Sequence, residues 1–210
     1  MAAYIGWKEG RRPAVNARDQ VIDNVRRAIV TARSTVEAPR GYRAAPASSD
    51  LVGLFVERVA DYHASVVRCG HDEVGNHLAR LVAGHRVVVP DGFGWLVPGA
   101  VPDRGLSHAD LETVEMVVTS ATVGIATTGT IVLDHGRGQG RRALSLVPDV
   151  HICVVRSDQV VADVPDAVAL LNPARPQTWI SGPSATSDIE LERVEGVHGP
   201  RTLQVLIIDL

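Results

Sequence analysis

The sequence is poor in the residues that build metal and redox centres. It has only two cysteines among 210 residues, Cys69 and Cys153, and no C-x-x-C pair. Two distant cysteines make neither a disulfide framework nor a cluster site, because a cubane iron–sulfur cluster normally takes four thiolates. The eight histidines include no H-E-x-x-H pattern and no Cys/His cluster. We therefore expect no metal and no cofactor in this chain, and a reducing, cytoplasmic location.

Several other features are scarce or missing. No apolar run approaches the roughly 20 residues that cross a bilayer, and the first ten residues, which include Lys8 and Glu9, lack the apolar core of a signal peptide. Aromatic residues are only 4% and the net charge is −3, which gives neither a stacking platform nor a general charge for nucleic acid. G-x-S-x-G, P-loop and dinucleotide fingerprints are absent. These absences argue against a membrane span, a nucleic-acid partner and several common enzyme classes.

Charge and composition divide the chain into two parts. Residues 1–43 carry nine basic and four acidic residues, a net +5, which leaves twelve basic and twenty acidic residues, a net −8, for the rest. We expect residues 1–47 to form a basic helical arm and residues 48–210 to form one domain. The arm could dock onto a partner or onto a second copy, giving a homo-oligomer. The alternative is that it is a solvated helix face.

Periodicity predicts an α/β fold. Helices are expected where apolar residues recur at helical spacing, and strands where short apolar runs occur between turn residues. Because helices alternate with strands at both ends while the middle is rich in strands, we expect three layers, a sheet with helices on both faces, and an antiparallel excursion in the middle. Helices are expected over 17–33, 48–63, 72–82, 107–114 and 163–172, and strands over 66–69, 86–90, 116–119, 124–127, 130–134, 144–147, 150–156 and 203–208, with another beginning at residue 178.

The stretch from 178 to 200 is the leading candidate for a ligand site. Gly182 and Pro183 mark a sharp turn, and such turns at the carboxyl edge of a sheet often bind ligands in α/β proteins. The turn could present N–H groups to an anion, with hydroxyls from Ser184 and Thr186 beside them. The alternative is a capped helix whose polar residues serve only the turn.

Two carboxylates and one histidine in the same stretch are the candidate catalytic residues. Ser187 and Glu190 have the spacing of a capping box, so a helix is expected to begin near Ser187. Asp188 and Glu190 would then occupy the positive end of its dipole, which argues against a phosphate and is compatible with a carboxylate ligand. His198 is the best candidate for a general base, and a buried structural histidine is the alternative.

Two further loops could hold an anion. Thr127, Thr128, Gly129 and Thr130 place three hydroxyls around a glycine, which fits either a ligand or a plain hairpin turn. The loop 136–142 carries three arginines between glycines, so Arg137 and Arg141 could close over an anionic substrate. The alternative is a long solvated loop.

Two blocks of the sequence resemble a known family. The first is Gly-Pro-Ser-x-Thr-x-Asp-Ile-Glu from Gly182, followed by Gly-Val-His-Gly-Pro, and the second runs from Val123 through Asp134 and from Arg141 to His151. Together they resemble the LUD-domain family, in its lactate utilisation protein C group. This resemblance implies a fold like that of the sugar-phosphate isomerases and CoA transferases. It also implies a role in oxidising L-lactate to pyruvate alongside iron–sulfur partner proteins.

The resemblance leaves two functions open. The first is a subunit of an L-lactate oxidising system, itself catalytic or not, which binds a small carboxylate or other anion while its partners hold the iron–sulfur clusters. The second is a stand-alone enzyme on a sugar phosphate, a CoA thioester or a folate. The family that this sequence resembles often has a glutamate where this sequence has Thr128. In related CoA transferases a glutamate can be the nucleophile, so the threonine argues against that chemistry here.

Overall fold

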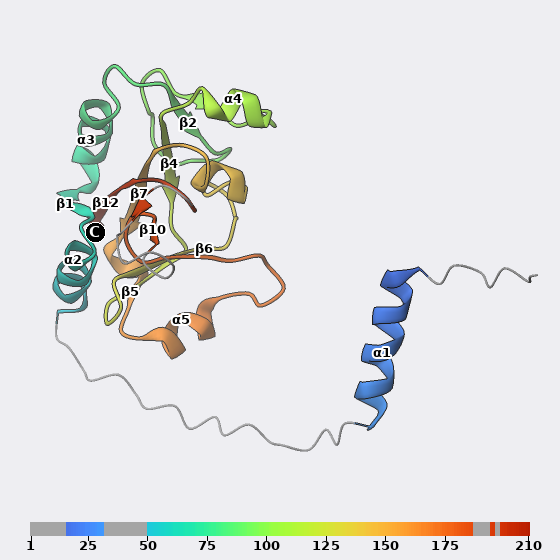
Figure 1. Ribbon diagram of the computed structural model, residues 1–210. Helices are drawn as coiled ribbons and strands as arrows, with labels where there is room; N and C mark the ends of the chain where they lie inside the picture. Colours follow the sequence, from blue (N-terminus) through green and yellow to red (C-terminus); the bar gives the residue numbers. More distant parts are fainter. Residues whose placement is uncertain (1–15, 32–49, 187–193, 196–197) are drawn as a thin grey trace, which may run out of the picture. The chain divides into compact units, whose positions relative to one another are not determined.

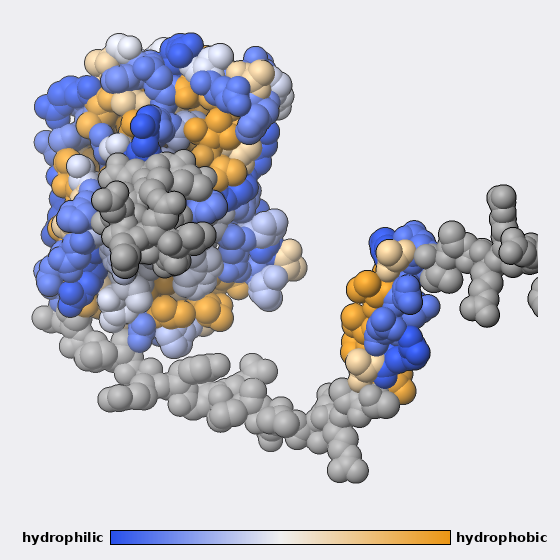
Figure 2. All heavy atoms as spheres, in the orientation of Figure 1, coloured by the Kyte–Doolittle hydropathy of each residue, from blue (hydrophilic) through white to orange (hydrophobic). Residues whose placement is uncertain are grey.

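The computed structural model describes residues 16–31, 50–186, 194–195 and 198–210, and the chain divides into two compact units, Met1–Gly41 and Tyr42–Leu210. In the first unit the described element is helix α1 (Ala17–Thr31), within the predicted range. Its apolar residues recur every three or four positions, so they line one side of the helix (Figure 2). Val21, Val25 and Ile29 are all more than half exposed.

The second unit is built on a six-stranded sheet in which every pair of neighbouring strands is parallel. The strand order is β1-β12-β7-β4-β2-β3 (Figure 1). The strands span Ser65–Gly70 (β1), Val87–Val89 (β2), Val101–Pro102 (β3), Met116–Ser120 (β4), Val150–Arg156 (β7) and Thr202–Asp209 (β12). The central strands are nearly all apolar, as expected for a parallel sheet covered on both faces.

Helices cover both faces of this sheet. Alternate residues of a strand point to opposite faces, so Ile152 and Leu206 pack with Leu78 of α3 (Val74–Leu81), while Val155 and Ile207 pack with Phe55 of α2 (Leu51–Asp61). Helix α4 (His108–Glu112) covers the far end of the α2 face through its buried Leu111. The predicted α/β architecture with helices on both faces is confirmed.

A second, four-stranded sheet packs on the α2 face and contains the predicted antiparallel excursion. Its order is β8 (Val160–Val161), β5 (Val123–Ile125), β6 (Thr130–Leu133) and β9 (Thr178–Ile180), with antiparallel pairing from β5 through β6 to β9. Ile131 joins the core under α2, and Val132 on its other face packs against Ala167 of α5 (Val164–Leu170). A separate two-stranded ribbon pairs β10 (Ala185–Thr186) with β11 (Val194–Glu195).

Two local predictions are wrong. The strand expected over 144–147 is a 3-10 helix, η2 (Arg142–Ser145), in which the Arg142 guanidinium donates 2.9 Å to the Ser145 carbonyl. The helix expected over 72–82 begins instead with a 3-10 turn, η1 (His71–Glu73), in which the Glu73 carboxylate accepts 3.0 Å from the Gly70 N–H. A last short turn, η3 (Ser157–Gln159), follows β7. Within the described ranges, no helix is both long and apolar enough to cross a bilayer.

Candidate functional site

A cavity of about 230 Å³ lies where β7 and β12 begin and where the turn after β9 approaches them. His151 and Leu203 are the second residues of these two strands and are register partners, so they form adjacent parts of the cavity wall. The site therefore combines the amino ends of these two strands with the turn that follows the carboxyl end of β9, where the ligand site was expected. The wall is made by Arg142, Ser145, His151, Thr178, Trp179, Ile180, Ser181, Gly182, Pro183, Ser184, His198, Gly199, Pro200 and Leu203.

Arg142 supplies positive charge to the cavity. Its Nη1 donates to the Ser145 carbonyl at 2.9 Å and to the Ser145 hydroxyl at 3.1 Å, and its Nη2 donates to the His198 carbonyl at 3.4 Å. Partial burial lowers the pKa of Arg142 from its ordinary value, but a guanidinium stays charged. No carboxylate of the described residues pairs with it, in contrast to Arg141, Arg175 and Arg201, which all pair with aspartates.

His151 supplies a neutral imidazole. The side chain is 1% exposed, and burial lowers its pKa to about 4, with the nearby charge of Arg142 contributing in the same direction. Its Nε2 lies 2.7 Å from the hydroxyl of Thr119, which in turn lies 3.7 Å from the Cys153 sulfur. Burial raises the pKa of the Cys153 thiol to about 12, so this polar chain carries no net charge at neutral pH.

Two short hydrogen-bonded networks connect residues outside the cavity to hydroxyls on its wall. Thr128 and Thr130 are joined at 2.7 Å, and Thr130 reaches the hydroxyl of Ser181 at 2.8 Å. On the other side, His135 Nδ1 lies 2.8 Å from the Gly140 carbonyl, and its Nε2 lies 2.8 Å from the hydroxyl of Thr178. Because a carbonyl only accepts, Nδ1 of His135 carries a hydrogen and donates it to the Gly140 carbonyl.

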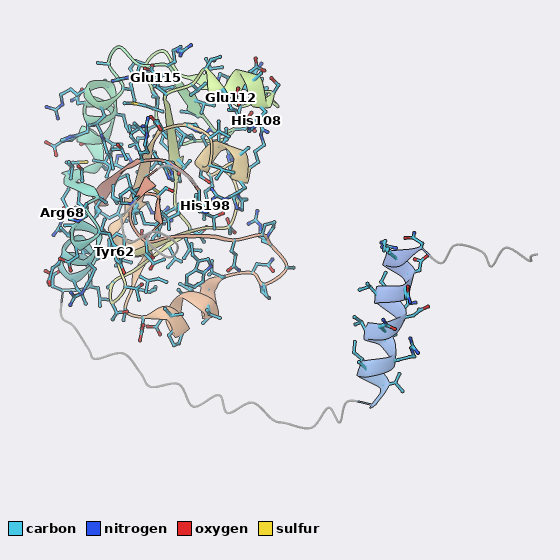
Figure 3. All side chains as sticks on the ribbon, in the orientation of Figure 1. Tyr62, Arg68, His108, Glu112, Glu115 and His198 are labelled. Atoms are coloured by element: carbon cyan, nitrogen blue, oxygen red, sulfur yellow. The ribbon has the colours of Figure 1, made fainter. Side chains whose placement is uncertain are left out.

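The turn after β9 needs glycine at its first position. Gly182 is buried with φ +81°, and a Cβ there would lie 2.6 Å from the Cβ of Tyr62, which lies at the end of α2 (Figure 3). Ser184 then ties the turn to the segment before β12: its N–H donates 2.8 Å to the Pro200 carbonyl, and its hydroxyl accepts 3.1 Å from the His198 N–H. The fold thus holds two distant segments against each other at the cavity mouth.

The structure brings some of the predicted site residues together. Gly182, Ser184 and His198 line the cavity, and Thr128 and Thr130 connect to it through Ser181.

Other predicted residues of the 127–130 turn have structural roles. Thr127 donates 2.9 Å to the carboxylate of Asp163, which also caps α5. Gly129 lies against the α2 backbone, where a Cβ would sit 2.6 Å from the carbonyl carbon of Arg58.

Arg137 and Arg141, the two arginines of the 136–142 loop that were predicted to bind an anion, lie outside the cavity wall. Arg141 forms a two-point ion pair with Asp103 at 2.9 and 3.1 Å, which lowers the pKa of that carboxyl. Arg137 packs over Gly92, where a Cβ would lie 2.3 Å from its Cγ. Gln139 is buried and bonded to Thr122 and to the backbone N–H at 134, so the loop is fixed in place.

Three predicted residues are described partly or not at all. Asp188 and Glu190 lie outside the described residues, as does the helix expected to begin near Ser187. The backbone of Thr186 belongs to β10, where it is the register partner of Val194.

Sequence reasoning did not select Arg142, Ser145, His151, Thr178 or Ser181 as site residues, although three of them lie in the 141–151 block that carried the resemblance. In the part of the chain that the structure describes, no group of three or more His, Cys, Asp or Glu residues could hold a metal ion.

Comparisons with known proteins agree on one family. The LUD domain model matches residues 100–208, a range that contains Arg142, His151 and His198. "Lactate utilization protein C" of Deinococcus radiodurans is 43% identical over 202 residues, covering 91% of this chain and 95% of that protein. A protein of the same name from Bacillus licheniformis is 24% identical over 192 residues, covering 76% of this chain and 79% of its own length. The crystal structure of a "duf162 family protein" from Deinococcus radiodurans superposes with a TM-score of 0.67 at 40% identity, covering 78% of this chain and 99% of that one. The chain therefore belongs to the LUD-domain family.

Proposed function

We propose that this protein is a subunit of an L-lactate utilisation system and that its cavity binds a small carboxylate. The relatives named for lactate utilisation support the first part. Only two cysteines are present, both buried, which is too few for a cubane cluster. Oxidation of lactate in such a system would therefore use iron–sulfur clusters held by partner proteins.

The observation that carries the ligand proposal is the guanidinium of Arg142. It lies on the cavity wall with no carboxylate partner among the described residues, while the adjacent Arg141 is fully paired with Asp103. A guanidinium presents donors in a fork that matches a carboxylate, and such charge-assisted bonds are about twice as strong as neutral ones. Ser181 and Thr178 add hydroxyls to the same wall. A small hydroxylated anion suits this set of groups.

The size of the cavity bears on the alternative ligands. Its volume of about 230 Å³ is below the roughly 300–1,000 Å³ of pockets that bury drug-sized molecules. It would therefore not enclose a whole CoA thioester or a folate. A sugar phosphate is the ligand of the stand-alone alternative that comes nearest in size, and it belongs in the same binding test.

The test is calorimetric titration of the full chain with L-lactate, pyruvate and a sugar phosphate. We expect L-lactate and pyruvate to bind the wild type. Arg142→Gln should lower their affinity roughly ten- to a hundredfold, since hydrogen bonds to charged groups contribute about 1.5–3 kcal/mol. Arg141→Gln is the matched control, because it removes the adjacent charge without touching the cavity. Binding that survives Arg142→Gln, or binding of the sugar phosphate alone, would contradict the proposal.

Partner proteins are tested by affinity purification from cells grown on lactate. We expect lactate-dependent dye reduction and iron in the eluate, neither of which this chain can supply through its own cysteines. The basic arm at residues 1–47 would serve assembly, either with those partners or with a second copy. Removing it should lower the number of chains per particle, measured as the molar mass in light scattering divided by the mass of the shortened chain. An iron-free, inactive eluate would favour the stand-alone enzyme.

A further inference from the structure

The polar chain behind His151 determines which hydrogen-bonding group the cavity offers beside Arg142. Thr119 has one hydroxyl hydrogen, so it can donate either to His151 Nε2 at 2.7 Å or to the Cys153 sulfur at 3.7 Å. An imidazole nitrogen at the shorter distance is much the better acceptor, since a thioether or thiol sulfur accepts only weakly. The Thr119 hydroxyl therefore donates to Nε2.

The Cys153 thiol does not compete strongly for the Thr119 hydrogen. Burial raises the pKa of this thiol to about 12, so the sulfur is neutral and, at 3.7 Å, only a weak acceptor. The Thr119 hydrogen therefore points to His151 Nε2 at 2.7 Å. A neutral ring whose Nε2 accepts must carry its proton on Nδ1.

Nδ1 is the ring nitrogen available to a ligand. Of the two nitrogens of His151, only Nε2 has a protein partner among the described residues. Every fully buried side-chain nitrogen or oxygen in those residues has a partner. Since Nδ1 has none, it is not fully buried, and the surface that His151 lines is the cavity. Nδ1 therefore faces the cavity, where it presents an N–H donor.

We propose that the cavity recognises carboxylates with an oxygen on the adjacent carbon, the 2-hydroxy and 2-oxo acids: Arg142 binds the carboxylate, His151 Nδ1–H donates to the 2-oxygen, and Thr119 is the positioning residue that holds this tautomer. The inference rests on the proposed function, since it assumes that the cavity binds a small carboxylate. It also assigns His151 a role as donor. In this tautomer His151 is not a base that could take the hydroxyl proton of lactate.

Ligand discrimination tests the proposal. Propionate has the carbon skeleton of lactate and pyruvate but no 2-oxygen, so the wild type should bind it about three- to tenfold more weakly, the factor that one neutral hydrogen bond supplies. Thr119→Val removes the hydroxyl while keeping the shape, and should bring the ratio close to one with little change for propionate. Thr119→Ser keeps the hydroxyl and should retain the ratio. A purely structural role for Thr119 would weaken all three acids together.

A spectroscopic measurement on the wild type does not depend on any variant folding. The ¹⁵N shifts of the His151 ring should identify Nδ1 as protonated and Nε2 as the acceptor. A protonated Nε2, a ratio of one in the wild type, or an unchanged ratio in Thr119→Val would each overturn the proposal.

Failure of the wider proposal gives a different result. If propionate, lactate and pyruvate bind equally and depend on Arg142, the carboxylate site stands and only the role of His151 falls. If none of the three binds the wild type, the carboxylate site itself is wrong.

Discussion

Protonation of His151 should make the fold sensitive to mild acid. Burial lowers the pKa of this ring from 6.5 to about 4. Between those two pH values the unfolded chain binds a proton at this position and the folded chain does not. The free energy of unfolding must therefore decrease as pH falls through this window, and it is unaffected by His151 well above pH 6.5.

The size of the effect follows from the shift. One pKa unit corresponds to about 1.4 kcal/mol, so the difference approaches about 3 kcal/mol near pH 4 and is about 2 kcal/mol at pH 5. This is a large part of the roughly 5–15 kcal/mol that stabilises a typical domain. The carboxyls whose pKa values are lowered, such as Asp103 and Asp149, add their own losses at more acidic pH.

The assay is urea unfolding at pH 7 and pH 5, followed by circular dichroism, for the wild type and His151→Gln. The variant keeps a polar side chain but cannot titrate, so its loss of stability between the two pH values should be about 2 kcal/mol smaller. The aspartates contribute equally to both proteins and cancel. His108→Gln, at an exposed histidine beside Glu112, is the control and should behave as the wild type. Equal losses in the wild type and His151→Gln would refute the reasoning, because the ring would then be titrating in the folded state as it does in water.

Three further predictions concern stability. Gly182→Ala should destabilise the fold by about 1–3 kcal/mol in urea unfolding, because its φ of +81° and its closeness to the end of α2 do not accommodate a Cβ. The control is Gly75→Ala in α3, where nothing lies within 4 Å of the new Cβ; it should stabilise the fold by about 0.5–1 kcal/mol. A similar loss of stability at both sites would contradict this account. Asp163→Ala should lower stability by about 1 kcal/mol by removing the cap of α5, and an unchanged midpoint would show that the cap is dispensable. Arg141→Gln should cost only about 0.5–1 kcal/mol, since the arginine is half exposed, while NMR titration should show the pKa of Asp103 rising toward its usual value; a carboxyl that still titrates as in the wild type would mean that the ion pair does not form in solution.

Local signals in the sequence account for most of the fold. The helices expected over 48–63 and 107–114 are present, and Asp50 and Ser107 cap them: each side chain accepts from a backbone N–H in the first turn of its helix. The short apolar runs became parallel strands because they are buried on both faces. The 144–147 segment failed because its alternating apolar residues fit a strand as well as a 3-10 turn, and the contact between Arg142 and Ser145 decides between them.

The site was predictable only in part, because it is assembled from distant segments. The glycine and serine of the 182–184 turn were found, since turn chemistry is local. The sequence did not predict which of two neighbouring arginines lines the cavity. Arg141 pairs with Asp103 and Arg142 lines the cavity, and this difference depends on residues far along the chain. The role of His151 depends on the pairing of β7 with β12 and β4, which no local pattern in the sequence records.

The position of β12 has a consequence for how the protein is made. This strand lies between β1 and β7, so the earliest strand of the sheet finds its neighbour only in residues 202–209. A nascent chain that has emerged from the ribosome only as far as residue 186 would have β1 separated from the rest of the sheet and its apolar faces open to solvent. Such long-range pairing folds slowly and exposes strand edges meanwhile. During synthesis, therefore, this domain should depend on chaperones until its last strand inserts.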